Sequence, residues 1–372
     1  MANILDYLDW RGDIPFSADP FNEADGLILS QFVYVPLNDI IPPDFGNNIT
    51  LKEAFEKYDP SAVDEKSKII SFDEDNILFE KMAQSERFGN IRLMGYTENI
   101  DPEKETQFKA VTCILENGMF FISYSGTDDT VIGWKEDFNI SYMKQTFGQL
   151  QAVNYLNDNF KNKCVIRTGG HSKGGNLAIY ASVFCDRNIK NSVAEIYSYD
   201  APGFREEITQ SWQYLGMLPK IKSFVPESSV VGMLLNNSME HKIVKSSAMG
   251  IKQHISYNWE ILRNRFVLTQ ELSKSGHIIN KALSGWIDDF NDEERKLFTE
   301  TLFSVLEAPE KDTIKEIAKN KWSAYSAMFR AIRSLSPEQQ AVIKDAFKKI
   351  AKNGKDALLS DKKENVPRGT NT

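Results

Sequence analysis

The residue in this sequence best placed to do chemistry is a serine between two glycines. Residues 170–174 read Gly-His-Ser-Lys-Gly, with a β-rich run over 164–167 before them and a helical segment rich in small residues after them. A serine at such a strand–turn–helix corner, a nucleophile elbow, is held with its hydroxyl exposed. The glycines are needed because a side chain there would strike the neighbouring strand or helix. The pattern favours Ser172 as a nucleophile over a glycine-rich turn that only saves space.

A serine nucleophile needs a base to accept its proton, and the chain has four histidines. His254 lies in a loop after the last predicted strand, and the base of an α/β hydrolase comes last in chain order. We therefore expect His254 to be the base, with His241 as a lesser alternative. His171 is interpreted as structural, and His277 as exposed or packed in a helical region.

Two carboxylates between the serine and the histidine could orient that base. Asp200 ends a predicted strand over 194–199, and Glu227 follows a predicted strand over 220–225. The commoner hydrolase order favours Glu227, whereas the short side chain and the rigid turn Asp-Ala-Pro-Gly-Phe over 200–204 favour Asp200. We prefer Asp200 and keep Glu227 as the alternative.

An oxyanion hole needs the backbone N–H after the nucleophile and a second donor from an early strand–loop. The first is the N–H of Lys173. The second is expected at Thr127, in the Ser-Gly-Thr turn that follows the strand predicted over 119–125. The Lys173 ammonium would either be solvated or face an acidic or phosphate-bearing substrate.

The elements that must position these residues alternate between strands and helices. Strands are predicted over 109–115, 119–125, 164–167, 194–199, 220–225 and 241–246, and helical spacing is found over 51–82, over 147–160 and after the elbow to Cys185. Residues 96–109 are polar and turn-rich. This order predicts an α/β-hydrolase fold, with a mainly parallel sheet flanked by helices.

A different organisation is expected after about residue 256, where the β signal stops. Helices are predicted over 259–272, 291–307, 311–334 and 337–351, with capping boxes that begin at Asn291 and Ser336. The polar residues after 352 predict a disordered tail. The expected domains are therefore a hydrolase domain over 1–262, a helical C-terminal region over 263–351 and a tail over 352–372.

Composition narrows the function classes. The chain has 372 residues, 41% of them hydrophobic, and a net charge of −8, which argues against a general nucleic-acid-binding role. No apolar run is long enough for a membrane span, and the acidic N-terminus does not resemble a signal peptide. Cys113, Cys164 and Cys185 are too few and too widely spaced for a disulfide framework or a zinc site. We expect a cytoplasmic protein with reduced thiols that needs no metal or organic cofactor.

Several of these segments together resemble a known group of enzymes. The strand and loop over 121–127, the Gly-Trp-Lys-Glu-Asp-Phe run over 133–138 and the elbow resemble class 3 (fungal-type) lipases. The similarity is closer to an uncharacterised bacterial family of lipase-like α/β hydrolases, a domain of unknown function, through residues 3–13, 200–204, 231–235 and 253–254. The resemblance spans about residues 1–262. It implies a serine hydrolase with Ser172, His254 and Thr127 in the nucleophile, base and oxyanion positions.

The sequence chiefly predicts a hydrolase of carboxylic esters, whose substrate would be a small ester, a thioester or a lipid. A peptidase or acyltransferase could use the same residues. The main alternative is a non-catalytic scaffold that binds a protein partner or forms a homo-oligomer through its C-terminal helices. Their apolar positions permit an amphipathic face, although such positions are more often core: Ile314, Ile317, Trp322, Phe329, Ile332 and Leu335.

Overall fold

The fold is built on one mixed sheet, and several candidate residues follow the carboxyl ends of its parallel strands. The computed structural model describes residues 1–64, 69, 71–128, 130–161, 164–273, 276–277, 289–309 and 321–364. Within these ranges, nine strands form a sheet in the order β1-β2-β3-β4-β5-β6-β7-β8-β11. They are β1 (Ile49–Thr50), β2 (Arg92–Asp101), β3 (Thr106–Ile114), β4 (Phe120–Tyr124), β5 (Ile166–His171), β6 (Val193–Tyr199), β7 (Ile221–Pro226), β8 (His241–Val244) and β11 (Leu268–Thr269).

The sheet is parallel only in its centre. Strands β4 to β8 pair in parallel, whereas β1, β2 and β3 join one edge and β11 joins the other by antiparallel pairing. The expectation of a mainly parallel sheet is therefore correct for the centre alone. Because parallel strands end at the same edge, the residues that follow β5, β6 and β7 lie side by side there.

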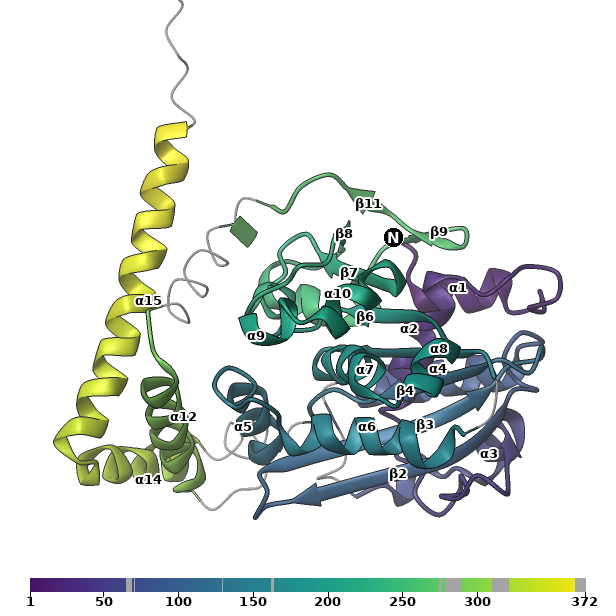
Figure 1. Ribbon diagram of the computed structural model, residues 1–372, viewed down its shortest axis with the longest axis horizontal. Coiled ribbons are helices and arrows are strands. Elements are labelled where there is room, and N and C mark those ends of the chain that lie inside the picture. Colours follow the sequence, from purple (N-terminus) through teal and green to yellow (C-terminus); the bar gives the residue numbers. More distant parts are fainter. Residues whose placement is uncertain are drawn as a thin grey trace, which may run out of the picture.

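Helices cover both faces of this sheet, as Figure 1 shows, which agrees with an α/β fold. Helices α1 (Ile4–Arg11), α2 (Glu23–Phe32), α3 (Leu51–Lys57) and α4 (Phe72–Gln84) supply one hydrophobic core, and α6 (Phe147–Asn159), α7 (Lys173–Phe184), α8 (Arg187–Ser192) and α10 (Trp212–Met217) supply the other. Phe121 and Ile122, adjacent in β4, belong to opposite cores. This alternation follows from the two-residue period of a strand.

Short polar signals fix where several helices begin. Asn3, Asn22, Thr50 and Thr146 each start a helix through a capping box, in which the cap and the third helical residue bond each other's backbone. The predicted box at Asn291 starts α12 (Asp292–Glu307), and the one at Ser336 starts α15 (Pro337–Glu364). Both predictions are confirmed.

Two local predictions are wrong, and in both places the structure has β-strands. The polar, turn-rich segment over 96–109 contains the end of β2 and the start of β3, which pair across a short turn. The helix expected over 259–272 is replaced by the hairpin β9 (Ile261–Leu262) and β10 (Arg265–Phe266) and by β11. In the segment 259–272, pairing with a neighbouring strand outweighs the local helical propensity.

Among its described residues, the C-terminal region contains α12, α14 (Lys321–Ser334) and α15, which stand beside α5 (Val131–Asn139) at one end of the sheet (Figure 1). The predicted helix over 311–334 lies partly outside the described residues. Helix α15 continues to Glu364, beyond the start of the disordered tail expected at 352. Within the part of the chain that the structure describes, no helix has the length and apolar character needed to cross a membrane.

Candidate active site

Ser172 occupies a strained corner between β5 and α7. Its backbone has φ 57° and ψ −135°, a conformation that residues other than glycine rarely adopt, and its side chain is partly exposed. The glycines on either side are sterically required, since a Cβ on Gly170 would lie 2.2 Å from the carbonyl carbon of Gly174 and one on Gly174 would lie 2.0 Å from the oxygen of Tyr124. The segment therefore has the geometry of a nucleophile elbow.

A histidine and an aspartate meet beside this elbow. His254, in the 3-10 turn Gly250–His254, places Nδ1 2.6 Å from Oδ2 of Asp200, which follows β6 and is fully buried. Oδ1 of Asp200 accepts hydrogen bonds from the Ser229 hydroxyl and from the N–H of Gly232, the latter at 3.1 Å. Asp200 has φ 48°, so its own turn is also held in a left-handed conformation. With Asp200 as acceptor, His254 carries its proton on Nδ1 and leaves Nε2 free to accept another.

His171 connects the elbow to the histidine loop. Its Nε2 lies 2.7 Å from the carbonyl oxygen of His254, and the two imidazole rings are 4.5 Å apart. Burial, together with the nearby imidazole of His254, lowers the pKa of His171 to about 3. The His171 ring is therefore neutral at physiological pH and donates a hydrogen bond to the His254 carbonyl. Because His171 directly precedes Ser172, this contact holds the His254 loop beside the elbow.

Tyr34, a residue that the sequence did not single out, joins the elbow to the loop that carries Gly126 and Thr127. Its hydroxyl accepts the N–H of Gly126 at 2.9 Å and donates to the carbonyl oxygen of His171 at 3.3 Å. Gly126 lies directly against Ser172, since a Cβ on this glycine would come within 3.0 Å of the Cβ of the serine. The tyrosine lies after α2, more than 90 residues before either partner, so no local pattern marks it.

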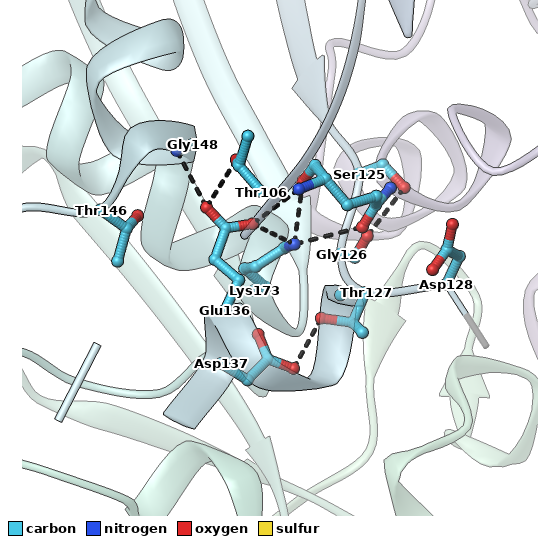
Figure 2. A network of polar contacts seen from close by, with 12 residues as sticks. Thr106, Ser125, Gly126, Thr127, Asp128, Glu136, Asp137, Thr146, Gly148 and Lys173 are labelled. Atoms are coloured by element: carbon cyan, nitrogen blue, oxygen red, sulfur yellow. Dashed lines mark hydrogen bonds and ion pairs between the residues drawn. The ribbon is translucent and has the colours of Figure 1, made fainter. Parts of the chain in front are cut away.

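Thr127, expected at the oxyanion hole, is held by a carboxylate of α5. Its hydroxyl lies 2.6 Å from Oδ2 of Asp137, as Figure 2 shows. Burial raises the pKa of Asp137 to about 6, against the opposing effects of Lys173 and of this hydrogen bond. At neutral pH the ionised Asp137 accepts the hydroxyl proton, so the side chain of Thr127 is engaged within the protein.

The side chain of Lys173 is not available to a substrate. It is fully buried, and its Nζ bonds Oε2 of Glu136 at 2.8 Å and both oxygens of Gln107, at 2.9 Å for the carbonyl and 3.1 Å for Oε1 (Figure 2). Both sequence interpretations of this ammonium, solvated or facing an anionic substrate, are therefore wrong. The ion pair joins α5 to the start of α7. Glu136 also accepts hydrogen bonds from Thr106, Gln107 and Gly148, which connect α5 to β3 and α6.

The loop that carries His254 is fixed by buried polar contacts to α2 and α4. Ser256 donates to Oε1 of Gln31 at 2.8 Å, and Gln31 and Tyr257 both donate to Oδ1 of Asp75, at 2.7 Å and 2.6 Å. Burial raises the pKa of Asp75 to about 7, and its second oxygen has no hydrogen-bond partner among the residues that the structure describes. Residues distant in sequence thus hold the candidate base in place.

The other candidates lie elsewhere. Glu227 uses its backbone N–H to bond Val244 and its carbonyl to accept the N–H of Ser273. His241 bonds the Ser223 hydroxyl through Nδ1 at 2.8 Å and is partly buried, and this desolvation lowers its pKa. His277 is exposed. The structure therefore brings His254 to Asp200 rather than to Glu227.

Among the described residues, no three His, Cys, Asp or Glu side chains gather where they could hold a metal ion. The three cysteines are unpaired, with Cys113 and Cys185 buried and Cys164 partly exposed.

Comparison with known proteins gives a family and shows a distant likeness to a solved structure. The sequence model of a family described as Mbeg1-like matches residues 82–304, which include the elbow and every candidate site residue. The crystal structure of M37 lipase is similar over 56% of this chain and 68% of that chain, with 12% identity and a TM-score of 0.39. No curated protein matches the chain. The family match confirms the predicted resemblance to a lipase-like family.

Proposed function

The chain belongs to the Mbeg1-like family, a lipase-like family, and we propose that it is a serine hydrolase of carboxylic esters with Ser172 as its nucleophile. The observation that carries the proposal is the 2.6 Å contact between His254 and the buried Asp200, made beside a strained serine elbow. A hydrogen-bonded His–Asp pair next to a partly exposed serine is the arrangement that activates a hydroxyl at neutral pH.

The proposed reaction proceeds through an acyl-enzyme. His254 Nε2 accepts the hydroxyl proton as Oγ of Ser172 attacks the acyl carbon, and Asp200 stabilises the imidazolium that forms. The backbone N–H groups of Lys173 and Thr127 hold the negative oxygen of the tetrahedral intermediate. Its collapse transfers the proton to the leaving alcohol, and water, activated by the same imidazole, then releases the acid and restores Ser172.

Support for the two oxyanion donors comes from their positions. Lys173 is the first residue of α7, where a backbone N–H has no partner within the helix. Thr127 follows Gly126, which lies against the Cβ of Ser172. Asp137 orients Thr127 through its hydroxyl and therefore acts as a positioning residue.

A fluorophosphonate probe tests the nucleophile. The wild type should be labelled and Ser172→Ala should not, with far-UV circular dichroism used to show that both are folded. Absence of labelling in folded wild-type protein would favour the alternative of a non-catalytic scaffold that acts through its C-terminal helices. Profiling with p-nitrophenyl esters of increasing chain length then separates a small-ester substrate from a lipid.

A matched pair of variants tests the acid. Asp200→Asn should lose about four orders of magnitude in kcat, because the imidazole would then be held in the wrong tautomer. Glu227→Gln serves as the control and should retain wild-type turnover. The reverse result would assign the role to Glu227.

A further inference from the structure

The C-terminal helices contact the hydrolase domain at α5, the helix that bears two residues of the proposed site. Phe138 of α5 packs against Phe298 and Phe303 of α12, with ring centroids 6.3 Å and 5.5 Å apart. Val131 lies two helical turns before Phe138 on α5. It shares a buried cluster with Phe303 and with Ala324 of α14. Both apolar anchors of α5 therefore point at the C-terminal region.

The opposite side of α5 meets the hydrolase domain through polar groups. Glu136 bonds Lys173 at the start of α7, and Asp137 bonds Thr127. Among the described residues, the two hydrophobic cores on the faces of the sheet include no side chain of α5. The apolar clusters that include side chains of α5 are thus shared with the C-terminal helices, while the polar contacts of α5 reach the site.

The same helices also support the other side of the site. Leu234 and Leu235 pack against the cluster formed by Phe290, Phe298, Val342 and Ala346, which joins α12 to α15. These leucines follow the 3-10 turn Val231–Met233, whose Gly232 N–H bonds Asp200. One helical unit therefore contacts both the segment that holds Thr127 and the segment that holds Asp200.

Polar contacts around the rim fix the orientation of α12. Asp292, in its first turn, accepts a hydrogen bond from Arg205 at 2.8 Å, and Arg295 donates to the carbonyl oxygen of Ser141 at 2.9 Å. Arg205 and Ser141 lie just beyond the Asp200 turn and α5, respectively. The interface is thus anchored at both of the elements that it supports.

We propose that α12, α14 and α15 form a clamp that holds α5 and the 231–235 segment in the arrangement needed for catalysis, with Phe303 and Phe138 as positioning residues. The inference rests on the proposed function for its catalytic consequence alone. Loosening the clamp displaces Thr127 through Asp137, and a displacement of about 1 Å costs roughly a hundredfold in rate. The C-terminal helices thereby become a part of the active enzyme.

The test uses full-length Phe303→Ala, with Phe303→Leu as the conservative variant. Phe329→Ala is the matched control, because Phe329 lies on α14 with 55% of its surface exposed. Hydrogen exchange of the amides over 127–141 reports the state of α5 whether or not the protein is an enzyme. Rates of p-nitrophenyl ester hydrolysis and of fluorophosphonate labelling report the site.

We expect Phe303→Ala to speed exchange over 127–141 and to lower kcat about a hundredfold with little change in KM. Phe303→Leu should restore most of both, and Phe329→Ala should match the wild type. If Phe303→Ala does not fold, Leu302→Ala provides a milder change, because this partly buried leucine packs against the same two clusters as Phe138. Unchanged exchange, or faster exchange with unchanged kcat, overturns the clamp, whereas a wild type that the probe does not label overturns the proposed function instead.

Discussion

Replacing Lys173 by methionine should destabilise the protein rather than impair substrate binding. The ammonium and its partner Glu136 are both buried, with exposed side-chain fractions of 0% and 1%, and their atoms lie 2.8 Å apart. Methionine fills most of the space of the aliphatic stem and removes the charge. Glu136 would then remain as a buried carboxylate without a counter-ion, and the two oxygens of Gln107 would lose their donor.

Removing one partner of a buried ion pair costs about 3–5 kcal/mol. The lower end is expected here, because Glu136 keeps hydrogen bonds from Thr106, Gln107 and Gly148. A domain of ordinary stability, about 5–15 kcal/mol, would still fold. The double variant Lys173→Met with Glu136→Gln removes both charges and should be less destabilised than Lys173→Met alone.

Urea unfolding followed by circular dichroism measures these free energies and the coupling between the two sites. The pKa of Glu136 is lowered because its hydrogen bonds and Lys173 outweigh burial, so the pair stabilises the fold above about pH 4.5 and less as the pH falls. The deficit of Lys173→Met should therefore shrink in acid. Unchanged stability together with a raised KM for an anionic ester would refute the buried-pair interpretation.

Three further predictions concern residues that surround the candidate site: Tyr34, Gly232 and Asp75. Tyr34→Phe should lower the free energy of unfolding by about 1–3 kcal/mol, because the buried backbone N–H of Gly126 loses its acceptor. Thermal unfolding measures this, and an unchanged Tm would contradict it. Gly232→Ala should lower kcat by about a hundredfold, since its Cβ would lie 2.5 Å from Oδ1 of Asp200, whereas Gly216→Ala, with open space at its Cβ, should be neutral. Burial raises the pKa of Asp75 in the folded state to about 7 from 3.8, so the free energy of unfolding should fall as the pH rises from about 4 to 7. Asp75→Asn should flatten this pH dependence in urea unfolding, and an unchanged dependence would exclude Asp75 as its source.

The elbow could be read from the sequence because its chemistry is local. Glycines at 170 and 174 flank the serine within one turn, and this spacing marks the elbow, although the oxygen that a Cβ on Gly174 would strike belongs to Tyr124 of β4. The capping boxes at Asn291 and Ser336 were equally readable, since a cap and its partner lie three residues apart.

The identity of the acid could not be read in this way. Asp200 and Glu227 both follow parallel strands at the same edge of the sheet, so chain order leaves both open. The left-handed turn at Asp200 and the N–H of Gly232, which lies 32 residues further on, aim that carboxylate at His254. Neither feature has a sequence signal near Asp200.

Lys173 shows the same limit for a charged side chain. Lysine next to a nucleophile suggests an exposed ammonium, because lysines are seldom buried without a partner. Its partner is Glu136, 37 residues earlier, and only the packing of α5 against α7 brings the two together.

The sequence by itself determined the local corner at Ser172, the alternation of strands and helices that makes an α/β fold, and the membership of a lipase-like family. Tertiary structure alone decided which carboxylate meets His254, that Lys173 is buried, and that α12 packs on α5. The physical reason is range: sterics and capping act within a few residues, whereas ion pairs, buried hydrogen bonds and helix packing join groups that only the complete fold brings into contact.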